Sequence, residues 1–314
     1  MTLPFPVHVA SGNLAEMARA SHWAFATASD GPRLLLVTPT EEGELAGAFS
    51  AAAPSALSRA SGGPAVLAGP ASLHVMLSLP REDTWLACPP DAILNRHVRP
   101  LLRALSRLGS PASYFGRDWI SVRHRPVALL AFAHDAASRR TLFEAFVAIA
   151  DPFARDARSS FMNKKSATLE EVLGKKVDKK ALTEHVARAY GEAAGASVER
   201  SDAPLTDLLG DWQVAPPRAR ALAWAETVAA PIGVVGMADC DGGVRLGGDF
   251  MLSSDVAAAI EGKLAPQAGA AELEALVLDL LTVTDAALYG FRSKEEFAQL
   301  VVQLHAKLNR KTAP

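Results

Sequence analysis

Residues 59–66 of this chain read Arg-Ala-Ser-Gly-Gly-Pro-Ala-Val. The pair Gly62 and Gly63 follows Arg59 and Ser61, and glycine lets backbone N–H groups come close to an anion because it has no Cβ. A plain turn between two strands accounts for the same residues equally well. The stretch is therefore interpreted either as an anion-binding loop or as a tight turn.

Predicted strands and helices surround this loop. Apolar runs and helical spacing indicate strands at 34–37, 73–79, 119–122, 127–133 and 143–149, and helices at 14–27, 91–108 and 179–193. Pro100 lies inside the helix at 91–108, so we expect a kink there or two shorter helices. Together these segments predict a mixed β-sheet with packed helices.

A change of composition follows at 200–217, which is rich in proline and acidic residues, and the pattern then starts again. Asp241-Gly242-Gly243 lies between apolar runs and is a hairpin signal. Helices are expected at 255–264, 271–281 and 293–308. We therefore expect an α+β fold in three spans: a first domain at 1–198, a linker at 199–227 and a small α+β accessory domain at 228–314.

The overall composition excludes several classes of protein. Hydrophobic residues make up 49% of the chain and charged residues 21%, which is ordinary for a protein with a real core. Lys+Arg is 32 against 34 for Asp+Glu, so a dedicated nucleic-acid binder is not expected. Two cysteines cannot form a disulfide framework, and no apolar run approaches the roughly 18 residues of a membrane span. A cytoplasmic protein without membrane contact is the expectation.

Common reaction centres are missing from the sequence. There is no nucleophile elbow, no phosphate-binding P-loop and no paired zinc histidines, and the eight histidines show no metal-ligand spacing. We therefore expect no metal site, and His74, inside an apolar strand, is interpreted as a core residue. The turn Gly116-Arg117-Asp118 is a second candidate for holding phosphate or carboxylate, because it combines a glycine with a guanidinium group.

Six short stretches, in the same order along the chain, resemble motifs of lipoate–protein ligases. They are Asn13-Leu14-Ala15 with Glu16, residues 59–66, residues 116–122, residues 166–173, Gly247-Gly248-Asp249-Phe250 with the helix to Leu264, and Leu288-Tyr289-Gly290-Phe291. The resemblance implies a catalytic domain of the biotin/lipoate protein ligase superfamily. It also implies a C-terminal accessory domain whose motif is Gly248, Asp249 and Phe250.

That family joins lipoate to ATP and then transfers the lipoyl group to a lysine of an acceptor domain. The resemblance therefore implies a pocket for lipoate or another acyl ligand, with ATP and Mg²⁺ as cofactors if the protein is active. It nominates seven residues for the lipoate or nucleotide pocket: Arg59, Ser61, Gly62, Gly63, Gly116, Arg117 and Asp118.

The sequence departs from the family at the essential lysine. In the family Gly-Arg-Lys-Val-x-Gly carries this lysine, whereas residues 124–129 read His-Arg-Pro-Val-Ala-Leu, so that Pro126 takes its place. Proline has neither a charge nor an N–H. Arg125 is a possible substitute, but in a strand its side chain points to the opposite face. No catalytic residue is assigned, and the prediction is a binding or regulatory protein with an eroded adenylation site.

Three alternatives stay open. One is an active ATP-dependent lipoate or acyl ligase that uses a rearranged basic residue. Another is a cysteine acyltransferase, although neither Cys88 nor Cys240 lies at a matching place. The last is an unrelated binding module.

Arginines recur every three or four residues along the predicted helix at 91–108. Arg96, Arg99, Arg103 and Arg107 form one row if the helix continues through Pro100. Such a row is either a solvated helix face or a docking surface for an acidic partner. The resemblance suggests an acidic lipoyl domain or another protein as that partner.

Overall fold

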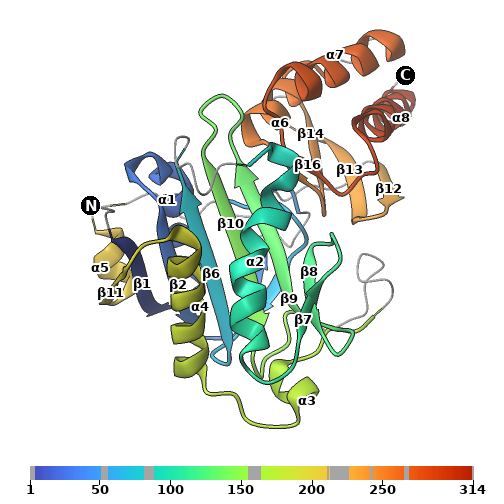
Figure 1. Ribbon diagram of the computed structural model, residues 1–314. Coiled ribbons are helices and arrows are strands. Elements are labelled where there is room, and N and C mark those ends of the chain that lie inside the picture. Colours follow the sequence, from blue (N-terminus) through green and yellow to red (C-terminus); the bar gives the residue numbers. More distant parts are fainter. Residues whose placement is uncertain are drawn as a thin grey trace.

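Figure 1 shows a computed structural model of the chain, which describes residues 4–50, 56–80, 88–154, 164–210, 212, 226–240, 243–264 and 269–312. We call residues 4–210 the N-terminal part and residues 226–312 the C-terminal part. Among the described residues, none of the helices combines the length and the apolar character needed to cross a membrane.

An eight-stranded mixed sheet forms the centre of the N-terminal part, in the order β11-β1-β2-β6-β10-β9-β8-β7. Strand β1 pairs in parallel with β11 and β2, and the remaining neighbours are antiparallel. The strands are β1 (Phe5–Gly12), β2 (Arg33–Pro39), β6 (Ser72–Leu79), β7 (Ala112–Tyr114), β8 (Trp119–Val122), β9 (Arg125–His134), β10 (Thr141–Ala148) and β11 (Val198–Asp202). The predicted mixed sheet and the α+β class are confirmed.

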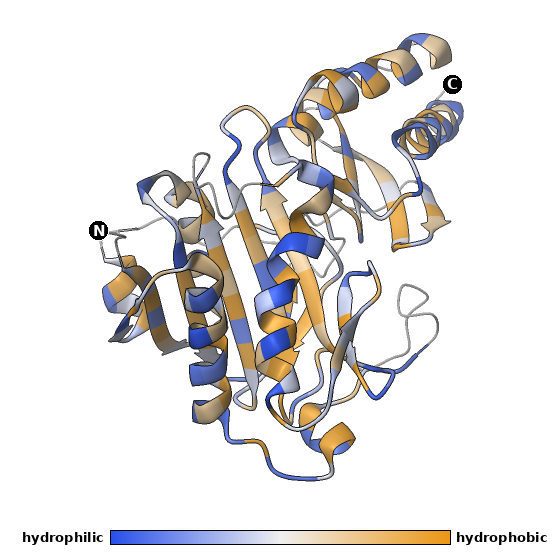
Figure 2. Cartoon of the chain, in the orientation of Figure 1, coloured by the Kyte–Doolittle hydropathy of each residue, from blue (hydrophilic) through white to orange (hydrophobic). Residues whose placement is uncertain are grey.

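Both faces of this sheet are covered, which explains why the central strands β6 and β10 are buried along their whole length and are mostly apolar. Helices α2 (Ile93–Ser106) and α4 (Lys179–Ala194) cover one face. Helix α1 (Leu14–Ala26) and a small sheet of β3 (Gly43–Ala46), β4 (Leu57–Ser58) and β5 (Val66–Ala68) cover the other, which we call the loop-side face. Figure 2 shows the hydrophobic strands between helices whose outer sides are hydrophilic.

Helix α2 does not split at Pro100, and its row of apolar residues explains why. Ile93, Leu94, Val98, Leu101 and Leu105 are all buried against the sheet and α4. This burial offsets the hydrogen bond that Pro100 cannot donate. The short helix α3 (Leu169–Leu173) begins with a capping box, in which Thr168 and Glu171 are bonded reciprocally.

The C-terminal part has a core of its own. It contains a sheet of β12 (Glu226–Ala230), β13 (Gly233–Cys240) and β14 (Gly243–Gly248), the pair β15 (Met251–Leu252) and β16 (Leu288–Tyr289), and helices α6 (Ser254–Glu261), α7 (Ala270–Val283) and α8 (Lys294–Thr312). Strands β13 and β14 pair up to Cys240 and Gly243, as the predicted hairpin requires.

The predicted linker at 199–227 contains regular structure in the N-terminal part. Strand β11 extends the main sheet, and α5 (Leu205–Leu209) packs on α1 and β1. Residues 211 and 213–225 lie outside the described residues. The division into two domains stays a prediction.

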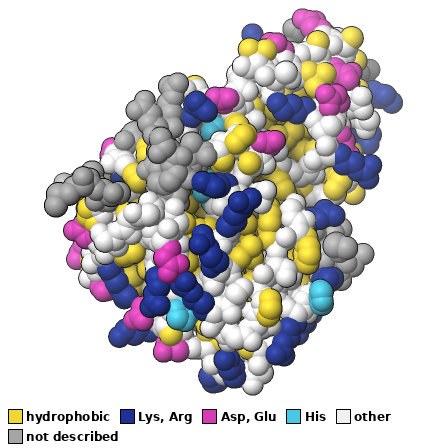
Figure 3. Space-filling view, viewed as in Figure 1, with side chains coloured by type: hydrophobic (Ala, Val, Ile, Leu, Met, Phe, Trp, Pro, Cys, Tyr) yellow, Lys and Arg dark blue, Asp and Glu magenta, His cyan; other side chains and the backbone are white. Residues whose placement is uncertain are grey.

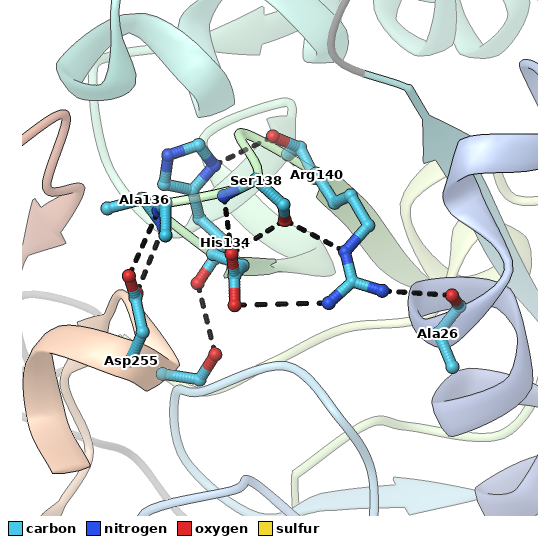
Figure 4. A network of polar contacts seen from close by, with 10 residues as sticks. Ala26, His134, Ala136, Ser138, Arg140 and Asp255 are labelled. Carbon is cyan, nitrogen blue, oxygen red and sulfur yellow. Dashed lines mark hydrogen bonds and ion pairs between the residues drawn. The ribbon is translucent and has the colours of Figure 1, made fainter.

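The two parts share a packed seam. Met251 and Ala287 of the C-terminal part lie in the core of the main sheet, while Phe49 and Ala136 lie in the core of the C-terminal part. Figure 4 shows the polar side of this seam at the turn between β9 and β10. There the Asp255 carboxylate accepts hydrogen bonds from the backbone N–H groups of Ala136 and Ala137, both at 3.0 Å.

Candidate functional site

In the loop at 59–66, the Arg59 side chain points into the protein. Arg59 is fully buried, and its guanidinium donates to the carbonyls of Leu45 (3.0 Å), Gly62 (2.7 Å) and Pro64 (2.8 Å). Its Nε donates to the hydroxyl of Ser61 at 2.9 Å. The sequence suggested that this loop binds an external anion. In the structure the Arg59 guanidinium instead donates hydrogen bonds to carbonyl groups of the loop and of strand β3.

The two glycines of this loop also use their N–H groups inside the protein. Gly62 donates to the carbonyl of Phe132 at 3.0 Å, and Gly63 donates to the carbonyl of Phe250 at 2.9 Å. A Cβ on Gly62 would lie 2.7 Å from the Phe250 oxygen and 2.9 Å from the Cα of Met251. Glycine is needed here because the backbone of the C-terminal part lies directly against the loop.

A polar network lies beneath the loop, on the loop-side face of the main sheet. His74 Nε2 and Glu144 Oε1 are 2.8 Å apart, and both side chains are buried. The Phe146 ring stacks on His74 at 4.1 Å and lies 5.1 Å from the Arg59 guanidinium. Burial favours a higher pKa for Glu144, but its hydrogen bond with His74 and the charges of His74 and Arg59 outweigh this effect and lower the pKa.

We call Arg59, Ser61, His74 and Glu144 the buried polar network. The prediction that His74 is a core residue is confirmed. Its partner Glu144 was missed, because one acidic residue within an apolar run carries no signal of what lies on the neighbouring strand.

Pro126 is buried in β9 and pairs with Ser121 of β8. Arg125 is about half exposed and forms an ion pair with Glu171 at 3.4 Å. Lys164, which the sequence reasoning did not single out, lies in the same neighbourhood: its Nζ donates to the His124 carbonyl at 3.1 Å.

Lys164 also lies over the ring of Trp119, 5.8 Å from the ring centre. No local pattern could have found this lysine, because its proximity to Pro126 depends on the backbone bond from Ala167 to the Pro126 carbonyl.

The turn Gly116-Arg117-Asp118 lies between β7 and β8. Gly116 adopts a φ of 69°, Arg117 is exposed and Asp118 is buried. Burial, followed by the negative charge of Asp118, raises the pKa values of Tyr114 and Tyr289. The hydroxyl of Tyr289, from the C-terminal part, donates to the Gly116 carbonyl at 3.3 Å.

The fold brings the two nominated loops to neighbouring points of β9. The Asp118 carbonyl accepts from the N–H of Leu130 at 2.7 Å, and the Phe132 carbonyl accepts from Gly62. The stretch Gly248-Asp249-Phe250 lies against the loop at 59–66, since Gly63 donates to the Phe250 carbonyl at 2.9 Å, and Gly248 donates to the Phe49 carbonyl at 2.6 Å. The rings of Phe49 and Phe250 stack at 5.0 Å, next to the loop at 59–66.

The arginine row lies elsewhere, on the solvent side of α2. Arg96, Arg99, Arg103 and Arg107 are all exposed, and Arg107 forms an ion pair with Glu192 at 2.9 Å. In Figure 3, lysine and arginine side chains gather over the region that α2 occupies in Figure 1. Within the described residues, no group of three or more His, Cys, Asp or Glu side chains could hold a metal ion.

Comparisons with known proteins give structural matches alone. No model of a protein family matches the sequence, and no curated protein matches it. The structure resembles that of LipL1 from P. falciparum in complex with lipoate, with a TM-score of 0.65 and 11% identity, over 95% of this chain and 99% of that one.

Two further solved structures match the chain over a shorter range. A bi-partite lipoate protein ligase from Thermoplasma acidophilum, described with its E2 lipoyl domain, matches with a TM-score of 0.53 and 13% identity, over 66% of this chain and 92% of that one. A lipoate-protein ligase A bound with ATP matches with a TM-score of 0.51 and 13% identity, over 66% and 94%. The chain therefore has the fold of the lipoate–protein ligases.

Proposed function

We propose that this protein is lipoate ligase-like but forms no lipoyl-adenylate, and that it acts as a binding or regulatory protein. The observation that carries the proposal is Pro126 in the position of the family's lysine. Adenylate formation places negative charge on phosphate and carboxylate oxygens, and a positioned cation stabilises that charge. Arg125 does not replace the lysine in this proposal, because its guanidinium is paired with Glu171.

The geometry of the loop at 59–66 supports the same proposal. A phosphate or carboxylate needs free N–H donors, and those of Gly62 and Gly63 are bonded to protein carbonyls. An acyl chain needs an apolar tunnel, whereas the face beneath the loop carries the buried polar network. These residues do not fit lipoate, ATP and Mg²⁺ in the family's arrangement.

The test is pyrophosphate release by the purified full chain with ATP, Mg²⁺ and either lipoate or octanoate. Loss of the one cation at the developing charge should slow adenylation on the order of 10²–10³-fold or more, so we expect no release above background. Release that depends on the acid would overturn the proposal.

Variants then show which cation is responsible for any release. Lys164 is the cation that favours the alternative, an active ligase with a rearranged basic residue, because its Nζ lies near Pro126 at the His124 carbonyl. Under that alternative Lys164→Met abolishes release, whereas Arg125→Ala leaves it unchanged. A gain of release in Pro126→Lys would show that the rest of the site is still competent.

We further propose that the arginine row on α2 binds an acidic protein, of which a lipoyl domain is the first to try. Arg99 and Arg103 are exposed, and neither side chain forms a hydrogen bond or ion pair with the residues that the structure describes. Long-range attraction by such charges speeds encounter with an acidic surface and is screened over about 8 Å at physiological ionic strength.

Capture of an acidic lipoyl domain at low salt tests this part. The double variant Arg99→Glu and Arg103→Glu should lose capture, while its free energy of unfolding stays within about 0.5 kcal/mol of the wild type. Lys263→Glu with Lys307→Glu is the matched control, because both lysines are exposed and the change of charge is the same. If the wild type captures nothing, or the double variant binds as well, the row is only a solvated face.

A further inference from the structure

A pocket of about 280 Å³ lies at the seam between the two parts of the protein. One wall is the turn at 116–118. The other wall comes from the turn between β12 and β13, at Pro231 and Ile232, and from residues 289–292 after β16. Figure 1 shows the turn between β7 and β8 directed towards β12 and β13. The volume is just below the usual range of about 300–1,000 Å³ for small-molecule sites, so only a small ligand would fit.

Each wall contributes an arginine whose guanidinium is unpaired within the described part of the chain. Arg117 and Arg292 both line the pocket and both are exposed. Neither guanidinium forms a hydrogen bond or an ion pair with any residue in the described ranges. Asp118 is the one acidic residue among the lining residues, so the lining carries one net positive charge. A guanidinium has five donors in a planar fork that fits carboxylate and phosphate oxygens.

Contacts across the seam hold the pocket in shape. The Tyr289 hydroxyl bonds to the Gly116 carbonyl, and thus ties one wall to the other. Gly290 adopts a φ of 117°, and a Cβ there would lie 2.8 Å from the side chain of Ile232. The Phe291 ring is fixed by an edge contact with Phe297 at 4.9 Å. A ligand would therefore meet a preformed site with an apolar side and two cationic groups.

We propose that this pocket binds a small metabolite that carries a carboxylate or phosphate group. The oxyanion lies between Arg117 and Arg292, and the apolar part of the ligand packs on Ile232 and Phe291. Because the two arginines belong to different parts of the chain, the ligand bridges the seam and stabilises the docked arrangement. The proposal does not depend on whether the adenylation site is active.

Titration calorimetry of the full chain tests the site with inorganic phosphate and with citrate, at constant ionic strength in chloride. We expect one of these probes to bind, and the probe that binds identifies the oxyanion class. Loss of one charge-assisted contact should weaken binding about tenfold or more in Arg117→Gln and in Arg292→Gln. Arg188→Gln, at an exposed arginine of α4, is the control and should bind as the wild type does.

Hydrogen exchange then locates the ligand. Binding should slow exchange in both walls, at 116–118 and at 289–292, because the ligand bridges them. The proposal is overturned if neither probe binds more tightly than chloride, or if the double variant of Arg117 and Arg292 binds as the wild type does. Slower exchange in regions away from both walls would also overturn it. Both arginines are exposed, so these variants are expected to fold normally.

Discussion

The loop at 59–66 and the turn at 116–118 look alike in sequence and differ in the folded protein. Each places an arginine near glycine. Arg59 is fully buried and satisfied by three carbonyls and a hydroxyl, whereas Arg117 is exposed at the mouth of a pocket and unpaired within the described residues. An arginine beside glycine therefore stabilises a loop when neighbouring strands enclose it, and can meet a ligand only when it reaches solvent.

The largest expected effect separates these two arginines directly. Arg59→Met should lower the free energy of unfolding by about 3–5 kcal/mol, because removal of one partner leaves buried carbonyls and Glu144 uncompensated. Arg117→Met, at an exposed site, should change it by less than about 0.5 kcal/mol. Urea unfolding measures both values. Equal losses in the two variants would contradict the comparison.

The buried polar network should also give the protein an acid-sensitive stability. The pKa of Glu144 lies below its usual value of 4.5, so the folded state prefers the ionised form. Its stabilising contribution is complete above about pH 4.5 and is lost as the pH falls through the lowered pKa, at no more than about 1.4 kcal/mol per pH unit.

Urea unfolding between about pH 5 and pH 3 measures this slope. Glu144→Gln should be less stable than the wild type near neutral pH and should show a flatter slope. Glu42→Gln is the control, since Glu42 is exposed and its replacement should leave the slope unchanged. An identical slope in Glu144→Gln would assign the acid sensitivity to other groups.

The glycines of the two regions provide a smaller contrast. Gly62→Ala should cost about 1–3 kcal/mol, because the new Cβ must push the backbone at Phe250 and Met251 away from the loop. Gly116→Ala meets open space and should cost only about 1 kcal/mol, from the left-handed backbone at a φ of 69°. Thermal unfolding of the two variants side by side measures the difference. A larger loss of stability in Gly116→Ala than in Gly62→Ala would mean that the backbone at Phe250 and Met251 moves away from the new Cβ at little cost.

The smallest expected effect is on the association of the two parts. The sequence predicts a linker at 199–227, so we expect limited proteolysis to cut within this range. The seam contacts at Asp255, Gly63 and Tyr289 should then hold the fragments together, so that the nicked protein elutes from a sizing column as one species. Two separate folded fragments would favour independent domains instead.

Local signals in the sequence predicted much of this fold. Thr168 with Glu171 begins a helix where the capping pattern places it, because a capping box involves neighbouring residues alone. Strand β11 was missed because it is an edge strand whose five residues are all exposed, so it has no apolar pattern. Its pairing with β1 joins residues almost 200 positions apart, so no local pattern in the sequence could predict it.

The candidate site was predictable only in its loops. The motifs at 59–66 and 116–118 were found, and the fold places them at neighbouring points of β9. What the loops bond to was not predictable, since Gly63 meets Phe250 from a distant part of the chain. The same holds for Lys164 near Pro126 and for the pairing of His74 with Glu144.

The bond from Gly63 to Phe250 has a consequence during synthesis. The ribosome adds about 5–20 residues per second, so on the order of 10–40 s pass between the emergence of the loop and that of Phe250. During this interval the nascent N-terminal part presents the apolar patch that Met251 and Ala287 later cover. Full maturation of the central sheet therefore waits for the last quarter of the chain, and truncated chains are the species most exposed to aggregation and to chaperones.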